Sequence, residues 1–223
     1  MNGVVIVQQP GPAAAAPPEL LLLFHGVGSS AEDLRPLGQA LAGQRPQAWI
    51  VSVPAAHPSD FGAGRQWFSV QGVTEANRPQ RVAAAMPAFL QAIAGWQGRS
   101  GATPAATTLI GLSQGAIMAL EATQLVEPPA GRVVAIAGRF AQPARVAPAG
   151  TVVHLLHGED DRVMPAGLAA DALAQLRALG TRATLDLFPG LGHGIDARVV
   201  QRLAQHLGEP GAVPPATSPP RPR

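Results

Sequence analysis

The chain has 223 residues, of which 47% are hydrophobic and 13% charged, and its formal net charge is +2. This length and composition are typical of a globular domain with a sizeable core, and they exclude a largely disordered chain. The absence of Cys excludes disulfides and thiolate chemistry, and the sixteen basic residues, all Arg, are scattered among carboxylates and form no stripe for a nucleic acid.

The N-terminal half is predicted to begin with short strands and no export signal. Its start, MNGVVIVQQP, lacks a basic segment before a long apolar run, and the longest strongly apolar stretch, residues 20–24, is too short to cross a bilayer. We therefore expect a soluble, cytoplasmic protein without stable membrane insertion. In chain order we expect a strand at 4–7, a strand at 20–24, a helix that Ser30 caps and that runs to about Ala42, a strand at 48–53 and a helix from about Pro79.

The second half alternates strands with helices. We expect a strand at 107–112, a helix at 116–126, strands at 133–137 and 151–156, a helix after Pro165, a strand at 183–188 and a helix over 199–207. This alternation predicts an α/β fold in which a mostly parallel central sheet is covered by helices on both faces. Residues 1–208 are expected to form one domain, and the Pro-rich residues 209–223 a disordered tail.

A candidate nucleophile lies where one strand meets a helix. Gly111, Leu112, Ser113, Gln114 and Gly115 form a G-x-S-x-G pentapeptide between the strand at 107–112 and a helix-forming run. Such a sharp turn lifts the Ser hydroxyl above the sheet, and the glycines allow close backbone approach. The alternative is a glycine-rich turn with an incidental Ser.

A second loop is predicted to stabilise a negatively charged oxygen. His25, Gly26, Val27 and Gly28 follow the most hydrophobic strand of the chain. We assign the oxyanion-hole donors to the backbone N–H groups of Val27 and Gln114. His25 precedes Ser113 and sits at a strand end, so we expect it to brace this loop by hydrogen bonding and not to act as the base.

The general base is assigned by its position after the last strand. In G-x-S-x-G hydrolases the chain order is Ser, acid, His. Of the histidines after Ser113, His154 and His157 belong to a strand and His206 to the last helix, whereas His193 lies in a glycine-rich loop. We therefore predict His193 as the base.

The acid should follow the strand at 151–156, where three carboxylates are consecutive. Glu159, Asp160 and Asp161 all lie in this loop, and their spacing alone cannot choose among them. Asp171 and Asp196 fall in helical stretches and are expected to be surface or cap residues. The acid would hold the tautomer of the base and stabilise its charged form.

Five segments together carry a family resemblance. They are LLLLFHGVG, GRQWFSVQGVTEANR, LIGLSQGAIMALE, HGEDDRVMP and GLGHGID. The chain resembles the phospholipase/carboxylesterase family of the α/β-hydrolases, the acyl-protein-thioesterase-like group, and most closely its small bacterial serine esterases. The resemblance implies the α/β-hydrolase fold without a large lid.

The resemblance also assigns site residues. It places the acid on Asp161 and suggests that Trp67 and Phe68 flank an acyl pocket, although a simple core cluster is the alternative for both. Met164 and Leu191, in the two loops of the acid and the base, are further expected substrate contacts. Because no insertion is large enough for a lid, we expect an open, shallow site suited to short or medium acyl chains.

The predicted function is that of a serine carboxylesterase acting through an acyl-enzyme on a small-molecule acyl ester. Thioesterase, lysophospholipase or acyltransferase activity on the same site is the first alternative, and a non-catalytic binding protein is the second. No cofactor or metal is expected, since His154 and His157 lie near carboxylates but lack further ligands. Monomer and homodimer remain open.

Overall fold

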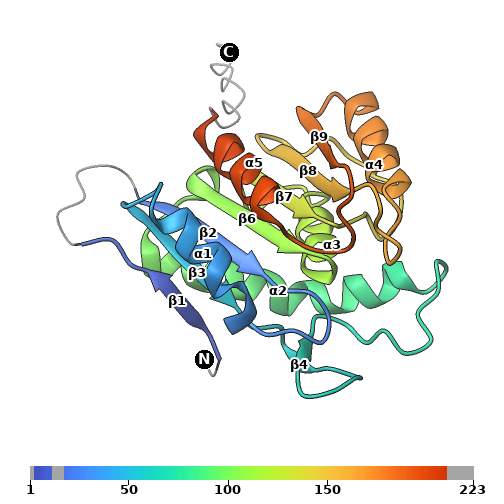
Figure 1. The fold of residues 1–223 in the computed structure, drawn as a ribbon, viewed down its shortest axis with the longest axis horizontal. Coiled ribbons are helices and arrows are strands. Elements are labelled where there is room, and N and C mark those ends of the chain that lie inside the picture. The colour runs from blue at the N-terminus through green and yellow to red at the C-terminus, as the bar shows by residue number, and fades with distance from the viewer. Residues whose placement is uncertain (1–2, 12–17, 210–223) are drawn as a thin grey trace, which may run out of the picture.

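A seven-stranded sheet forms the centre of the protein (Figure 1). The computed structural model describes residues 3–11 and 18–209. The strands are β1 (Val5–Gln8), β2 (Glu19–Phe24), β3 (Ala48–Val53), β6 (Thr107–Leu112), β7 (Arg132–Ile136), β8 (Val152–Gly158) and β9 (Ala183–Phe188). Their spatial order is β1-β3-β2-β6-β7-β8-β9, and all neighbours are parallel except β1 and β3. The predicted mostly parallel sheet is thus confirmed.

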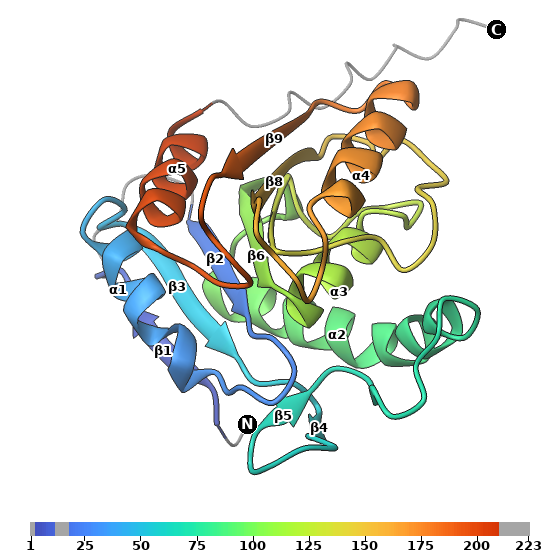
Figure 2. The same ribbon diagram turned by 45° about the vertical axis from the view of Figure 1, so that its right-hand side comes forward.

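Helices cover both faces of this sheet (Figure 2). One face carries α1 (Arg35–Ala42) and α5 (Ala197–Gly208), and the other carries α2 (Arg78–Ser100), α3 (Gln114–Ala122) and α4 (Gly167–Ala178). No large lid is inserted into the described fold. The segment after β3 contains a two-stranded hairpin, β4 (His57–Pro58) and β5 (Arg65–Gln66).

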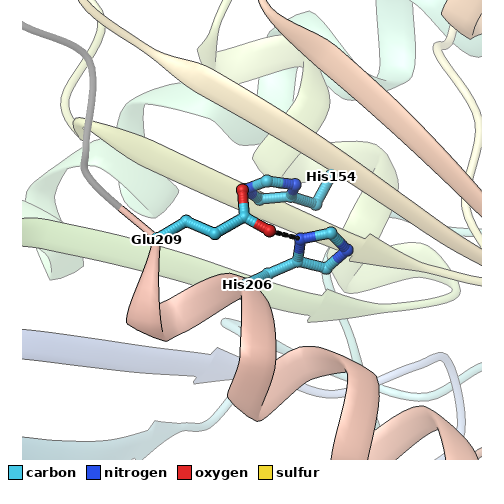
Figure 3. A group of neighbouring side chains, drawn as sticks. All are labelled: His154, His206 and Glu209. Carbon is cyan, nitrogen blue, oxygen red and sulfur yellow. Dashed lines mark hydrogen bonds and ion pairs between the residues drawn. The ribbon is translucent and has the colours of Figure 1, made fainter.

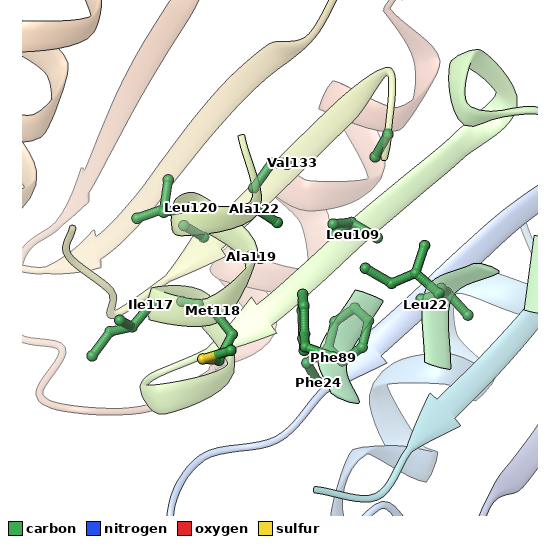
Figure 4. Close-up of a cluster of buried hydrophobic side chains, with 14 of the residues drawn as sticks. Leu22, Phe24, Phe89, Leu109, Ile117, Met118, Ala119, Leu120, Ala122 and Val133 are labelled. Atoms are coloured by element: carbon green, nitrogen blue, oxygen red, sulfur yellow. The ribbon is translucent and has the colours of Figure 1, made fainter. Parts of the chain in front are cut away.

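The strand β2 explains why both faces need a cover. Its alternate side chains pack into separate core clusters: Leu20, Leu22 and Phe24 on the α2–α3–α4 side, and Leu21 and Leu23 on the α1–α5 side. Figure 4 shows the first cluster around α3 and β6. A strand that is apolar on both faces is stable only in the middle of a covered parallel sheet.

The helix expected from Ser30 begins differently. Ser30 does not cap it with its hydroxyl; the Asp33 carboxylate instead accepts hydrogen bonds from the Ser30 amide at 2.9 Å and from both the Ser29 and Ser30 hydroxyls. A short 3₁₀ turn, Glu32–Leu34, follows, and α1 continues from Arg35. A charged carboxylate accepts hydrogen bonds from this loop more strongly than a hydroxyl would. The hydrogen bonds to Asp33 therefore hold the loop, and the helix starts further along the chain.

Some expectations fall on the ends of the chain. Apart from Glu209, the predicted Pro-rich tail lies outside the described residues. Residues 12–17, before β2, also lie outside them. Among the helices of residues 3–11 and 18–209, none combines the length and the apolar character needed to cross a membrane.

Gly115→Ala should destabilise the protein by about 3 kcal/mol, because overpacking against backbone cannot be relieved by a side-chain rotation. The added Cβ would lie 2.2 Å from the Phe24 carbonyl oxygen. Gly98→Ala in α2 is the matched control: its Cβ would meet nothing within 4 Å, and it should raise stability by roughly 0.5–1 kcal/mol. Urea unfolding measures both, and equal effects would contradict the close approach at Gly115.

Candidate active site

Ser113 occupies a strained turn between β6 and α3. Its backbone has φ 53° and ψ −114°, and Ala137 is the other non-glycine residue with positive φ in the described ranges. The Ser113 amide donates to the Ile136 carbonyl oxygen at 2.9 Å. A Cβ on Gly111 would lie 2.5 Å from the Ala116 backbone, so glycine is required there too. This geometry is that of a nucleophile turn, and strain of this kind clusters at functional sites.

His193 lies between Ser113 and Asp161. Its Nε2 is 2.8 Å from Ser113 Oγ, and its Nδ1 is 2.7 Å from Asp161 Oδ2. Because a carboxylate only accepts hydrogen bonds, Nδ1 carries the proton and Nε2 accepts the Ser113 hydroxyl. The three residues follow β6, β8 and β9, at the carboxyl ends of parallel strands, where α/β folds bind ligands.

Of the three consecutive carboxylates, only Asp161 is turned inward. Glu159 and Asp160 are exposed, whereas Asp161 is buried. Its Oδ1 accepts hydrogen bonds from the Val163 amide at 2.9 Å and the Met164 amide at 2.8 Å. Burial alone would raise the pKa of Asp161, but the Met164 amide and the His193 imidazole outweigh it and leave that pKa below its ordinary value.

Sequence reasoning missed a second imidazole beside this carboxylate. His157 Nε2 lies 3.2 Å from Asp161 Oδ2 and 2.6 Å from the Met164 carbonyl oxygen. Since that carbonyl is an acceptor, Nε2 is protonated and donates to it. The sequence placed His157 at the end of a strand, but nothing in its spacing shows that the following loop turns back onto it.

The loop with Val27 lies directly beside the nucleophile. A Cβ on Gly26 would be 3.2 Å from Ser113 Cβ and 3.7 Å from its Oγ. The Gly28 amide donates to Arg65 at 2.9 Å, which fixes the loop to β5. Within the described part of the chain, neither the Val27 amide nor the Gln114 amide has a hydrogen-bond acceptor, as expected of donors kept for a ligand.

His25 holds this loop in place by hydrogen bonds to Gly26 and Ala55. The Ala55 amide donates to His25 Nε2 at 3.0 Å, so Nδ1 carries the proton and donates to the Gly26 carbonyl oxygen at 2.7 Å. The side chain is fully buried, and this burial lowers the pKa of His25. A neutral imidazole with a hydrogen bond on each nitrogen matches the structural role predicted for His25.

The Gln114 side chain ties the nucleophile helix to the segment of Trp67 and Phe68. Its Oε1 accepts from the Trp67 amide at 2.8 Å, and its Nε2 donates to the Phe68 carbonyl oxygen at 2.7 Å. The Trp67 indole donates to the His25 carbonyl oxygen at 2.9 Å. These contacts hold the walls of the site together.

Trp67 and Phe68 themselves are buried in the core cluster, where Trp67 packs edge-on against Phe24 and Phe89. They also line a surface hollow of about 430 Å³ with His57 and Arg81 among its other residues. The alternative expected for both residues was a simple core cluster, and most of their surface is buried in one. Contact with a substrate stays a prediction for both.

Met164 and Leu191 are partly buried and contact the two core clusters. Their backbones organise the acid loop: the Leu191 carbonyl oxygen accepts from the Asp160 amide at 3.0 Å, and the Met164 carbonyl oxygen accepts from His157. Contact between their side chains and a substrate is likewise still a prediction.

A second hollow near the site was not predicted. It has a volume of about 390 Å³ between α1, the end of β6 and the start of α5. Leu112, directly before Ser113, and Ile195, two residues after His193, both line it. No sequence pattern joins these residues, because they meet only through the fold.

One group of side chains away from this site offers ligands for a cation. His154, His206 and Glu209 each present a ligand atom within 4.8 Å of the others.

The chain is similar to known proteins along most of its length. Residues 2–209 match the family described as Phospholipase/Carboxylesterase. Esterase YpfH of Escherichia coli (strain K12) is 45% identical over 202 residues, covering 91% of this chain and 86% of that protein. The crystal structure of esterase PE8 has a TM-score of 0.80 at 30% identity, covering 90% of this chain and 95% of that one. The Bacillus cereus carboxylesterase, with a TM-score of 0.76 at 18% identity over 92% of each chain, shares the fold.

Gln114→Ala should cost about 2–4 kcal/mol of stability, because it leaves the buried Trp67 amide and Phe68 carbonyl oxygen without partners. Gln91→Ala, on an exposed position of α2, is the control and should change stability by less than about 0.5 kcal/mol. Thermal and urea unfolding compare the two variants. A Gln114→Ala variant as stable as the wild type would show that this side chain does not hold the two segments together.

Proposed function

Because this chain belongs to the phospholipase/carboxylesterase family and is a carboxylic ester hydrolase, we propose that it cleaves small to medium acyl esters with Ser113 as nucleophile, His193 as base and Asp161 as the acid that orients the base. The observation that carries this proposal is the continuous hydrogen-bond chain from Ser113 Oγ through His193 to Asp161, with distances of 2.8 and 2.7 Å. Each role matches the order along the chain expected for this fold.

In the first half of the reaction, Ser113 Oγ attacks the ester carbonyl carbon while His193 Nε2 takes the hydroxyl proton. The imidazolium formed is stabilised by the Asp161 carboxylate on its other nitrogen. His193 then gives the proton to the leaving alkoxide, which departs as an alcohol and leaves an acyl-Ser113 ester.

In the second half, a water molecule takes the place of the alcohol. His193 Nε2 accepts a proton from that water as it attacks the acyl carbonyl, and then returns the proton to Ser113 Oγ. The products are a carboxylic acid and the free enzyme. The same residues therefore serve both halves, which explains why one short hydrogen-bond chain is sufficient.

The Val27 and Gln114 amides are the proposed oxyanion-hole donors. Gly26 lies beside Ser113 Oγ, and Gln114 begins α3, whose first N–H groups have no partners within the helix. Two unpaired amides next to the nucleophile would favour the tetrahedral intermediate over the planar ester. Removing one such donor typically lowers the rate by about 10²–10³-fold.

The rim of the site supports an apolar acyl group of modest length. Val27, Phe61 and Val163 are exposed by 38%, 63% and 71%. Val27 belongs to the oxyanion loop, Val163 to the acid loop, and the Phe61 carbonyl oxygen lies near Gly28. Exposed apolar side chains around a site without a lid suit a short or medium chain that remains partly in solvent.

Thioesters and lysophospholipids could react by the same mechanism, since the acyl carbonyl is the reacting group in each. A non-catalytic binding protein fits less well, because binding alone would not require the Ser113–His193–Asp161 chain. Acetyl, butyryl and octanoyl p-nitrophenyl esters, compared with the matching thioesters, distinguish the substrate classes.

Ser113→Ala should lower hydrolysis of p-nitrophenyl butyrate by at least about 10⁴-fold, because no nucleophile remains. It should also prevent labelling by a fluorophosphonate, detected by mass spectrometry. Ser100→Ala, at the distant end of α2, should keep both properties. Turnover and labelling that persist in a folded Ser113→Ala variant would assign the nucleophile elsewhere.

Asp161→Asn should lower kcat by about 10³–10⁴-fold, since an amide favours the wrong tautomer of His193. Asp160→Asn, on the exposed neighbour, should have little effect.

Because the pKa of Asp161 is lowered in the native state, the contribution of this carboxylate to stability is present above the unfolded pKa. It is lost only as the pH falls through the lower native value. A wild-type pH–rate profile limited by a carboxyl titrating above the ordinary Asp range would contradict this assignment.

A further inference from the structure

A second polar cluster lies at the opposite end of the parallel strands from Ser113. His154 is in the first half of β8, while His206 and Glu209 are at the end of α5 (Figure 3). Both histidines are buried: His154 is 1% exposed and His206 is 0% exposed. The Glu209 carboxylate reaches toward both rings, and one ligand atom from each residue lies within 4.8 Å of the other two.

Each imidazole has a partner on the nitrogen that faces away from Glu209. His206 Nε2 is 2.6 Å from Asp186 Oδ2 on β9, and His154 Nδ1 is 2.9 Å from Thr184 Oγ1 on the same strand. In metal sites, a ligating His almost always donates its other ring N–H to a carboxylate or another acceptor, which orients the ring. His206 donates to Asp186 in this way, and the Thr184 hydroxyl can accept the corresponding N–H of His154.

Between His206 and Glu209 a positive charge is required. His206 Nδ1 is 2.9 Å from Glu209 Oε1. With Nε2–H donating to Asp186, a neutral His206 would point the lone pair of Nδ1 at a carboxylate oxygen, and two acceptors at that distance repel. Either a second proton or a cation must lie there.

His154 distinguishes these two possibilities. The buried Nε2 of His154 has no hydrogen-bond partner in the described part of the chain, and it offers an electron pair in the tautomer in which Nδ1 donates to Thr184 Oγ1. A proton between His206 and Glu209 leaves this nitrogen unpaired, whereas a cation accepts all three donors.

We propose that His154, His206 and Glu209 form a binding site for a single Zn²⁺ ion, with Asp186 and Thr184 orienting the two imidazoles. Two imidazole nitrogens and one carboxylate oxygen are a common ligand set for zinc, and water can complete a tetrahedron. The rings stack at 3.9 Å with planes inclined by 23°. The proposed ion would lie beside this stacked pair, next to the Glu209 carboxylate.

The surrounding charges define the site further. Arg202 pairs with Asp186 at 2.6 Å, Arg182 approaches Glu209 at 3.8 Å, and Arg132 donates to the Glu209 carbonyl oxygen at 2.6 Å. Arg202 and Arg182 therefore offset part of the negative charge of Asp186 and Glu209. The ion would join the end of α5 to β8 far from Ser113, so its effect is on stability and not on acyl transfer.

The test measures zinc binding in the full chain carrying His193→Ala, which removes competing ligation by the catalytic imidazole. Equilibrium dialysis with elemental analysis should give one Zn²⁺ per chain with a Kd of about 1 µM or tighter. The Tm of thermal unfolding should rise by about 5–10 °C at a free zinc concentration roughly 100-fold above Kd.

Glu209→Gln should weaken binding by at least about tenfold, and His154→Gln should abolish it. Glu159→Gln, on an exposed carboxylate near the other end of β8, is the matched control and should bind zinc like its parent. Absence of bound zinc in the parent, or unchanged affinity in the folded Glu209→Gln variant, would overturn the site and assign the charge between His206 and Glu209 to a proton. Glu209 is part-exposed, so this variant tests the site even if His154→Gln does not fold.

Discussion

The structure depends above all on the close approach of the turn at Ser113 to the end of β2. Gly115 lies so near the Phe24 carbonyl oxygen that a Cβ would be 2.2 Å away. This contact brings the start of α3 against the loop that follows β2, and it places Gly26 beside Ser113. The unfavourable backbone angles of Ser113 are tolerated because β6, β2 and α3 are buried and cannot move apart. Packing of an apolar sheet therefore produces the geometry of the reactive turn.

A similar constraint fixes the loop of Asp161 to the loop of His193. A Cβ on Gly158 would lie 2.2 Å from the Leu191 carbonyl oxygen, and the Asp160 amide donates to that same oxygen at 3.0 Å. The loops after β8 and β9 thus form one unit, because two parallel neighbouring strands end side by side. His193 needs no long hinge to reach Asp161, and His157 closes the far side of the carboxylate.

Much of the fold was predictable, for identifiable reasons. The expected strands at 48–53, 107–112 and 183–188 coincide with β3, β6 and β9, since each is a β-branched or apolar run between turn residues. The helix expected at 116–126 is α3, Gln114–Ala122, which begins earlier because the turn occurs at Ser113 itself. Ser113 and His193 could be singled out as candidates because each lies in a glycine-flanked turn after a strand, whereas the choice of Asp161 among three consecutive carboxylates needed the family resemblance. The bridging Gln114 side chain and the pairing of His154 with His206 could not, since these contacts join segments distant in sequence. The contact of His157 with Asp161 is local, and it depends on how the short loop between them turns.

The division of the site along the chain has a consequence during synthesis. The turn of Ser113 and the Val27 loop belong to strands β6 and β2, whereas Asp161 and His193 follow β8 and β9, the last strands to be made. Proteins emerge from the ribosome N-terminus first, and partly made chains expose incomplete sheets. A nascent chain that has completed β6 carries the Ser113 hydroxyl without the proposed proton acceptor, His193. Under the proposed mechanism, ester cleavage therefore requires β9 and the loop that follows it to have been made.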